Sequence, residues 1–280
     1  MKSILCVNSN VDNCYSEFGF LSKIKDKLKT KLISSEYIKE LNINVTSVSL
    51  PPNFNKRAYL HNITYAKKLC KCREIQLSPK TLRPMDYNYF NEFQKRLLGF
   101  SVMKSIQLML RMRNKSIKNS CIVVYDASEM INYNIIVELA KESKYIVFLS
   151  RNLSKARKLA DYIIANFGVS PIVTDDELYA VKIADFIISS KDYEFDHGEL
   201  VWLLDNSMNV AKNIIAVNDV SYNVPWNTLK EDFSIELLGS ILCQMQESDI
   251  EKALKYNGIY LEEIKFNNNV IYWPVLGLAY

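Results

Sequence analysis

The clearest pattern of apolar and polar positions lies between Cys121 and Ala160, where apolar runs are separated by polar turns and a helical repeat. The run from Cys121 to Tyr125 is apolar and rich in β-branched residues, which is typical of a strand covered on both faces. A turn from Asp126 to Glu129 leads into apolar residues at helical spacing from Met130 to Leu139, and Tyr145 to Leu149 is a second apolar run. Parallel strands joined by a right-handed helical crossover fit this spacing. The pattern therefore predicts a βαβα unit.

The same pattern continues after this unit. A helix from Leu153 to Phe167 ends at Gly168, because glycine readily adopts the left-handed conformation found at helix ends. Three acids at 175–177 precede a short helix that ends at Val181, so we interpret them as favourable charge at a helix N-terminus and expect no metal site. The further elements expected are strands at Pro171 to Val173, Phe186 to Ser189 and Asn213 to Asn218, and a helix from His197 to Asp205.

Short strands and amphipathic helices also alternate in the N-terminal half. We expect strands at Ile4 to Val7, Ile43 to Leu50 and Glu74 to Leu77, and helices at Lys56 to Cys70 and Phe90 to Arg113. The last helix is apolar on more than one side, which favours a spine between two domains. Near the C-terminus, Ser234 to Met245 predicts a helix, and a hairpin is expected from Ile259 to Ile264 and Val270 to Trp273.

A lysine-rich segment, Lys23 to Lys31, has two possible interpretations. Its lysines could form a patch for nucleic acid. However, Ile24, Leu28 and Leu32 recur at helical spacing, which favours an amphipathic helix whose lysines face water. The lysine runs also lack interleaved aromatic residues, so we expect no nucleic-acid partner.

Composition sets the scale of the fold. The chain has 280 residues, 49% of them hydrophobic and 24% charged, which suits a globular protein large enough for two domains. We expect an α/β fold with limits at 1–115 for an N-terminal α/β domain, 116–228 for a doubly wound parallel sheet domain, and 229–280 for a C-terminal helix and hairpin that pack back on the first domain. A net charge of +4 decides nothing about partners.

Targeting signals are not apparent in the sequence. It contains no run of 18 or more apolar residues, and its first ten residues lack a signal-peptide core, so we expect a cytoplasmic protein without a membrane partner. None of the six cysteines forms a CxxC pair, and reduced thiols are expected. Cys70 and Cys72 are interpreted as a helix end.

Two short segments follow the two strands of the βαβα unit, Asp126-Ala127-Ser128-Glu129-Met130 after the first and Ser150-Arg151-Asn152 after the second. Together they resemble the NADP-binding domain of the glutamyl-tRNA reductase and shikimate dehydrogenase group of Rossmann proteins. The first segment stands where that group has a Gly-Ala-Gly-Glu-Met type turn after the first strand, and the second stands where it has Asn-Arg-Thr after the second strand. The interval from Met130 to Arg151 is 151 − 130 = 21 residues, which matches the group without a gap. The apolar spacing after Arg151, up to Ala160, matches as well.

The glycines of the phosphate-binding turn are replaced here by Asp126, Ser128 and Ile131. In a dinucleotide site these glycines make the tight turn, admit the pyrophosphate and allow close packing of helix on strand. The Ser128 hydroxyl can cap the helix or donate to a phosphate. The positive field of the helix N-terminus that would stabilise a phosphate also stabilises the Asp126 carboxylate, so the carboxylate competes with a phosphate for this place. Alternatively, Asp126 is simply the N-cap of the helix.

The resemblance implies NADP as the cofactor. Ser150 stands where an NAD site has an acid for the ribose, and Arg151 can take the 2′-phosphate of NADP. The alternative is that Arg151 only caps and solvates the turn. In the group, the residues after the fourth strand lie beside the nicotinamide ribose, and Ser189 and Ser190 stand at that place here. The residues implied to bind the cofactor are Asp126, Ala127, Ser128, Glu129, Met130, Ser150, Arg151, Asn152, Ser189 and Ser190.

The resemblance also singles out Lys80 as a catalytic residue. In the group a strand of the substrate domain ends in a proline closely followed by the catalytic lysine, and Pro79-Lys80 looks like that arrangement. A cation at a loop tip could protonate or polarise a carbonyl as hydride arrives. The group's partner aspartate is not found, because Lys95 and Arg96 stand in its neighbourhood. Lys80 could equally be a solvated loop residue.

Two functions therefore remain open at this point. The first is an NADP-dependent oxidoreductase that acts on a small carbonyl or imine substrate in an inter-domain cleft, with a homodimer as its expected assembly. The second is a catalytically inactive Rossmann-fold binding or scaffold protein that has lost dinucleotide binding. The three lost glycines count against the first function. Because a fold alone does not imply a function, they do not decide between the oxidoreductase and the inactive module.

Overall fold

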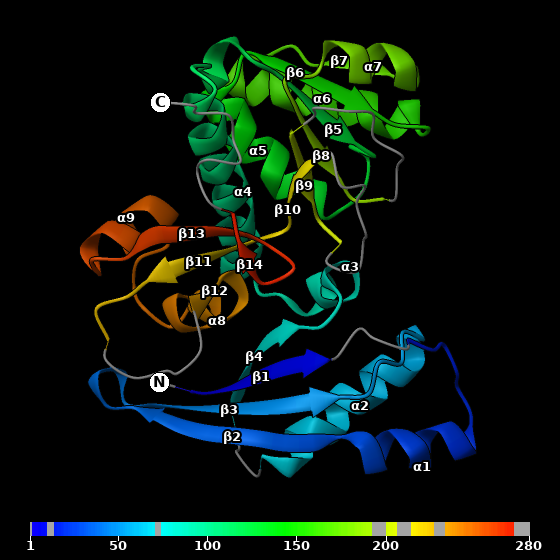
Figure 1. Ribbon diagram of the computed structural model, residues 1–280, viewed down its shortest axis with the longest axis vertical. Helices are drawn as coiled ribbons and strands as arrows, with labels where there is room; N and C mark the ends of the chain where they lie inside the picture. The colour runs from blue at the N-terminus through cyan, green and yellow to red at the C-terminus, as the bar shows by residue number, and fades with distance from the viewer. Residues whose placement is uncertain are drawn as a thin grey trace. The chain divides into compact units, whose positions relative to one another are not determined.

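The computed structural model describes residues 2–9, 14–70, 74–191, 200–205, 214–226 and 233–271. The chain divides into two compact units, which Figure 1 shows along the chain from blue to red. The first unit comprises Met1–Gln94 and Tyr222–Tyr260, and the second comprises Lys95–Ser221 and Leu261–Tyr280. This division lies inside the long helix rather than near Ser116, and the domain limits expected from the sequence remain a prediction.

The second unit is built on a parallel sheet. Its strands are β5 (Cys121–Tyr125), β6 (Tyr145–Leu149), β7 (Ile172–Thr174), β8 (Phe186–Ser189), β9 (Leu200–Leu203) and β10 (Ile215–Val217). They lie in the order β10-β9-β8-β5-β6-β7, and all neighbouring pairs are parallel. Counted along the unit, this is the doubly wound order 3-2-1-4-5-6 of dinucleotide-binding sheets. The α/β fold class and the Rossmann-like sheet expected from the sequence are confirmed.

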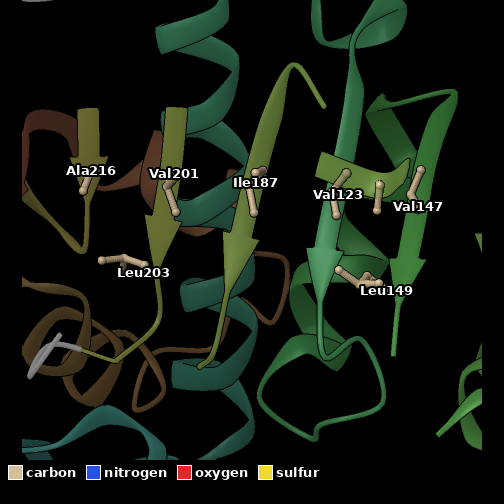
Figure 2. Close-up of a cluster of buried hydrophobic side chains, with 8 residues drawn as sticks. Val123, Val147, Leu149, Ile187, Val201, Leu203 and Ala216 are labelled. Atoms are coloured by element: carbon tan, nitrogen blue, oxygen red, sulfur yellow. The ribbon is translucent and has the colours of Figure 1, made fainter. Parts of the chain in front are cut away.

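An apolar layer runs across this sheet. Figure 2 shows Val123, Val147, Ile187 and Val201 on four neighbouring strands, and all four side chains are at most 1% exposed. Such burial explains why these strands are continuous apolar runs in the sequence. The helices of this unit are α5 (Asn132–Glu142), α6 (Leu153–Phe167), α7 (Glu177–Ile183) and the part of α4 (Glu92–Met112) from Lys95 onward, with a 3₁₀ turn η3 (Ile117–Asn119) before the sheet.

The long helix α4 packs closely within the second unit. A Cβ added to Gly99 would lie 2.6 Å from the carbonyl oxygen of Asn134 in α5, so only glycine allows this approach. Further along α4, the Ser105 hydroxyl accepts a hydrogen bond of 2.9 Å from the indole of the buried Trp202 in β9. These two contacts explain why most of α4 groups with the parallel sheet.

Some predictions about element type or limits are wrong in this unit. One of them concerns α7, which ends at Ile183 instead of Val181. The helix expected from His197 to Asp205 is replaced by strand β9, while His197 itself lies outside the described residues. A short apolar run that is buried on both faces cannot be assigned to helix or strand by periodicity alone. Another error concerns α5, which begins at Asn132 instead of Met130, because the turn after β5 is longer than expected.

The first unit contains a mixed four-stranded sheet. Its strands are β1 (Ser3–Ser9), β2 (Lys31–Ile38), β3 (Ile43–Leu50) and β4 (Ile75–Lys80), in the order β2-β3-β1-β4. β1 is parallel to β3 and β4, whereas the edge strand β2 is antiparallel to β3. Its other elements are α1 (Phe20–Lys29), η1 (Lys39–Leu41), α2 (Lys56–Leu69), α3 (Arg83–Asp86), η2 (Tyr87–Tyr89), α8 (Ile235–Leu242) and α9 (Ile250–Tyr256). Cys70 is the C-cap of α2, and Cys72 lies outside the described residues.

A third sheet has the order β12-β11-β13-β14, with β11 (Asp219–Asn223), β12 (Phe233–Ser234), β13 (Tyr260–Phe266) and β14 (Asn269–Val270). The last two strands form the expected antiparallel hairpin. Asn267 and Asn268 make its two-residue turn with φ of 48° and 64°, a left-handed conformation that asparagine tolerates. The predicted strand beyond Ile271 lies outside the described residues.

Candidate functional site

The order of the parallel sheet marks one place for a ligand. Strand order reverses between β5 and β8, and ligands of such sheets bind beyond the carboxyl ends of the strands at that reversal. The segments at 126–132, 190–191 and 150–152 follow β5, β8 and β6 respectively, and Ser189 is the last residue of β8. The structure therefore brings the cofactor-binding residues predicted from the sequence to one edge of one sheet.

Asp126 makes the turn that follows β5. Its φ is 57°, a left-handed conformation that aspartate adopts more readily than most residues, and its carbonyl accepts a hydrogen bond of 2.9 Å from the Glu129 amide. The next amide, that of Ala127, donates to the Leu149 carbonyl at the end of β6 over 3.2 Å. Asp126 thus provides a backbone conformation that glycine usually supplies.

The interpretation of Asp126 as the helix N-cap is wrong. Ile131 occupies the N-cap position of α5, and no side chain caps this helix among the described residues. The Asp126 carboxylate forms an ion pair with the Lys191 ammonium group instead. The Asp126 side chain is 9% exposed and that of Lys191 is 56% exposed, so the carboxylate is buried while the lysine side chain is largely in contact with solvent. This ion pair joins the end of β5 to the end of β8, at the strand reversal.

Asn132 was not predicted as a site residue, although it bridges the same two strand ends. Its side chain is fully buried, and its Nδ2 donates to the carbonyls of Tyr125 and Asp126 at 3.2 and 2.9 Å and to the Ser190 hydroxyl at 3.5 Å. Its Oδ1 has no hydrogen-bond partner among the described residues. The signal available in the sequence was the amide side chain of Asn132, which stands between Ile131 and Tyr133 near the start of the predicted helix.

Two serines link the turn after β5 to the turn after β6. The hydroxyls of Ser128 and Ser150 lie 3.0 Å apart, and both residues are buried. Ser150 also accepts a hydrogen bond of 3.2 Å from the Asn152 amide, and the Asn152 side chain caps α6 by accepting from Lys155 at 3.1 Å. Ser128 therefore does not cap α5, because its hydroxyl is held by Ser150.

Arg151 is exposed and lies near the end of β5. Burial and a 2.9 Å hydrogen bond to Glu177 raise the pKa of Tyr125 to about 12, and the positive charge of Arg151 acts in the opposite direction. Arg151 is thus a cation beside the candidate site. Glu129 and Met130 are exposed on the turn, whereas Ala127 is buried.

Ser189 is the last residue of β8, and Ser190 follows it. The fully buried Ser189 hydroxyl donates to the Lys191 carbonyl at 2.6 Å and accepts from the Lys191 amide at 3.3 Å. It therefore holds the loop that carries Lys191. Ser190 is half-buried and bonded to Asn132, as described above.

Lys80 belongs to the first unit, where it is the half-buried last residue of β4 and lies opposite Asn8 of β1. Its predicted catalytic role remains a prediction. The residue that follows it, Thr81, belongs to a buried polar cluster. The Asp86 carboxylate accepts hydrogen bonds from the Thr81 amide at 2.7 Å, from the Thr81 hydroxyl at 2.8 Å and from the Tyr59 hydroxyl. These bonds fix the backbone directly after Lys80.

Burial dominates the electrostatics of this cluster. Asp86 is 1% exposed, and the loss of hydration raises the pKa of its carboxyl to about 7, against the opposing effect of the hydrogen bonds from Tyr59 and Thr81. The negative charge of Glu236 raises this pKa further. Glu236 is itself buried in an ion pair with Arg83, with 3.3 Å between Oε1 and Nη2. The segment after Lys80 thus rests on two buried carboxyl groups.

Metal and membrane-spanning features are not found in the described part of the chain. No group of three or more histidine, cysteine or acidic side chains there could hold a metal ion. None of the helices described is both long enough and apolar enough to cross a bilayer.

Comparison with known proteins gives likenesses of fold. No protein-family model and no curated protein sequence matches the chain. Among solved structures, a shikimate dehydrogenase in complex with NADP+ is 14% identical over 98% of this chain and 93% of that chain, with a TM-score of 0.40. The ligand-free 5-ketofructose reductase of Gluconobacter sp. strain CHM43 is 10% identical over 99% and 96%, with a TM-score of 0.38. The L-tryptophan dehydrogenase from Nostoc punctiforme is 11% identical over 71% and 62%, with a TM-score of 0.33.

The buried Asp86 should make stability depend on pH. Its pKa rises from 3.8 to about 7 on folding, so the folded protein retains a proton that the unfolded chain loses between these values. The contribution of Asp86 to the free energy of unfolding should therefore be greatest below about pH 4. It should fall, by up to about 4 kcal/mol, as the pH rises through 7. Urea denaturation at several pH values measures this slope.

The variant Asp86→Asn cannot ionise at this position and should lose most of that slope between pH 4 and 7. Asp161→Asn, at an exposed position of α6, is the matched control and should keep it. An unchanged slope in Asp86→Asn would show that Asp86 does not retain its proton in the folded state.

Proposed function

We propose that this protein is an NADP-dependent oxidoreductase that acts on a small carbonyl or imine, with the cofactor at the carboxyl edge of the parallel sheet. The observation that carries the proposal is the position of Arg151. It is exposed at the end of β6, and its charge acts on Tyr125 at the end of the neighbouring strand. An arginine at this point of the fold suits the 2′-phosphate that distinguishes NADP from NAD.

The turn after β5 fits a dinucleotide in its backbone conformation. Asp126 adopts the left-handed conformation of a glycine turn, and its charge is balanced by Lys191, so it does not present a free anion to a phosphate. The side chains of Ser128 and Ile131 leave less room than glycines would. Both are buried, with exposed fractions of 7%, and therefore point away from solvent at this edge.

The chemistry would be hydride transfer supplied by the bound cofactor. Among this chain's own residues, we assign Lys80 the role of donating a proton to the carbonyl oxygen or imine nitrogen, or of polarising that group. The hydrogen bonds from Thr81 to Asp86 support this assignment, because they hold the backbone next to Lys80 in one conformation. A rigid backbone favours an ammonium group held in a reactive position.

A second candidate function is favoured by the ion pair between Asp126 and Lys191. Together with the side chain of Asn132, it joins the ends of β5 and β8 at the strand reversal, where a pyrophosphate would need to approach the backbone. If this link stays closed, the second unit is a catalytically inactive Rossmann-fold binding or scaffold module. NADPH binding separates the two candidates.

Arg151→Ala should weaken NADPH binding at least tenfold and leave any NADH binding within about twofold, because only NADPH carries the 2′-phosphate. Titration followed by the fluorescence of the reduced nicotinamide measures both affinities. Arg157→Ala is the matched control, since Arg157 is also exposed on the segment of α6 that follows Arg151. Equal losses for NADPH and NADH would contradict the role of Arg151.

Replacing Asp126 tests the second candidate. Asp126→Asn keeps a side chain that tolerates the left-handed turn and removes the charge, while Asp126→Gly removes both charge and strain. Both should strengthen NADPH binding about tenfold by freeing Lys191 for a phosphate. Binding that appears only in these variants, with none by the unmodified protein at millimolar NADPH, would favour the inactive module.

Lys80→Ala should reduce turnover at least 100-fold and leave NADPH affinity unchanged, because a positioned acid typically contributes 10²- to 10⁴-fold to the rate. Oxidation of NADPH with a panel of small aldehydes, ketones and imines provides the assay. Lys56→Ala, an exposed lysine of α2 in the same unit, is the control. Full turnover by Lys80→Ala would remove its catalytic assignment.

A further inference from the structure

The helix α1 has its polar side turned inward and its apolar side turned outward. Phe20, Leu21 and Leu28 are 78%, 80% and 77% exposed, and Ile24 is 44% exposed. With 3.6 residues per turn, these four side chains share an arc of roughly 100°. The buried residue Asp26 lies on the opposite side. The sequence correctly predicted an amphipathic helix here, but Leu32, which it counted as part of the apolar face, lies in β2. The face that the helix buries is the polar one.

A hydrogen-bond network explains this orientation. The Asp26 carboxylate accepts from the Tyr15 hydroxyl at 2.6 Å and from the amides of Asn53 and Asn62 at 2.9 and 3.0 Å. Thr30 adds a bond of 2.8 Å from its hydroxyl to the Asp26 carbonyl. A buried carboxylate needs such partners, and they lie on the body of the first unit. The network therefore fixes the apolar side of α1 toward solvent.

Lysines flank the apolar arc on both sides. Lys23 and Lys27 lie on one flank of the helix and Lys25 and Lys29 on the other, as follows from their helical spacing. Their ammonium groups rest 4.3 to 5.6 Å from the centres of aromatic rings of the same unit. The α1 helix carries no exposed acid, because its one acidic residue is the buried Asp26.

Exposed apolar side chains also occur in the element that follows α1. The helix α1 leads directly into the edge strand β2, as the blue segment of Figure 1 shows, and β2 begins with Lys31. Leu32, Ile33 and Tyr37 of β2 are 58%, 55% and 53% exposed. Large apolar side chains that gather at one place on a surface mark an interaction site.

A second copy of this chain fits the surface poorly. Two copies that met through α1 would bring ten helix and strand lysines together, five from each. Among these five, only Lys25 has an acidic partner within the described residues, Glu17 at 3.7 Å, so like charges would still oppose one another. Edge-to-edge pairing of β2 is also hindered, because the strand is irregular between Leu32 and Ser34, and such a bulge blunts an edge. The partner should instead be anionic and broad.

We propose that α1 and the start of β2 form a surface that binds the anionic face of a lipid bilayer. In this arrangement Phe20, Leu21 and Leu28 enter the boundary of the acyl chains. The lysines on both flanks reach the phosphate groups with their long side chains. A helix with one apolar face and basic flanks lies in the membrane plane and does not span it. The sequence led us to expect no membrane partner because it lacks a long apolar run, but surface binding does not require one.

Sedimentation of the full chain with lipid vesicles tests the proposal. We expect binding to vesicles of equal phosphatidylglycerol and phosphatidylcholine and at least tenfold weaker binding to pure phosphatidylcholine. Raising sodium chloride from 50 to 500 mM should weaken the first interaction, because salt screens exposed charges. These expectations are independent of the proposed enzymatic function.

Two double variants divide the apolar and electrostatic contributions. Leu21→Ser with Leu28→Ser should lower vesicle binding at least tenfold without unfolding the protein, since both side chains are mostly exposed. Lys27→Gln with Lys31→Gln should lower it about fivefold for each lysine. The matched controls are Leu178→Ser, at an 82% exposed leucine of α7, and Lys252→Gln with Lys255→Gln on α9. The controls should bind as the unmodified protein does.

Several outcomes would overturn the proposal. Absence of vesicle binding, or equal binding to both vesicle types, would do so. A dimer in light scattering that Leu21→Ser with Leu28→Ser dissociates, without vesicle binding, would assign the surface to a second copy. Binding of poly-L-glutamate with the same dependence on these leucines, again without vesicle binding, would assign it to an acidic polypeptide.

Discussion

The ion pair between Asp126 and Lys191 is the interaction on which the candidate site depends. It connects the ends of β5 and β8 at the one place where the order of the parallel sheet reverses. The buried amide of Asn132 reinforces it by donating to both segments. Because ligands of doubly wound sheets approach at this reversal, the ion pair lies where the proposed dinucleotide would bind. The same contact balances the charge of Asp126 and holds the ends of β5 and β8 together.

Buried carboxyl groups have a similar organising effect in the first unit. Asp86 collects donors from Tyr59 and Thr81 and so fixes the backbone beside Lys80. Asp26 collects donors from three other residues and so turns the apolar face of α1 outward. In each case a buried acid needs hydrogen bonds, and around Asp26 this need outweighs the apolar pattern of α1. The candidate catalytic loop and the candidate membrane surface both follow from this requirement.

The sheet of the second unit was predictable because its strands are covered on both faces. Continuous apolar runs such as Cys121–Tyr125 and Tyr145–Leu149 exist in the sequence for that reason, and the spacing between them requires a helical crossover. The same signal failed at Leu200–Leu203, because a short apolar run suits a strand or a buried helix equally well. Edge strand β2 gave no signal, since most of its side chains are exposed or half-buried.

By itself, the sequence determined most of the strands and helices of the parallel sheet unit, the left-handed end of α6 at Gly168, and the residues that lie at one edge of the sheet. Only the tertiary structure decided that Asp126 pairs with Lys191, that Asn132 bridges two strand ends and that α1 buries its polar face. The physical reason is that periodicity reveals two different faces of an element but not which one meets the protein. Partners far apart in the sequence, brought together by the fold, make that choice.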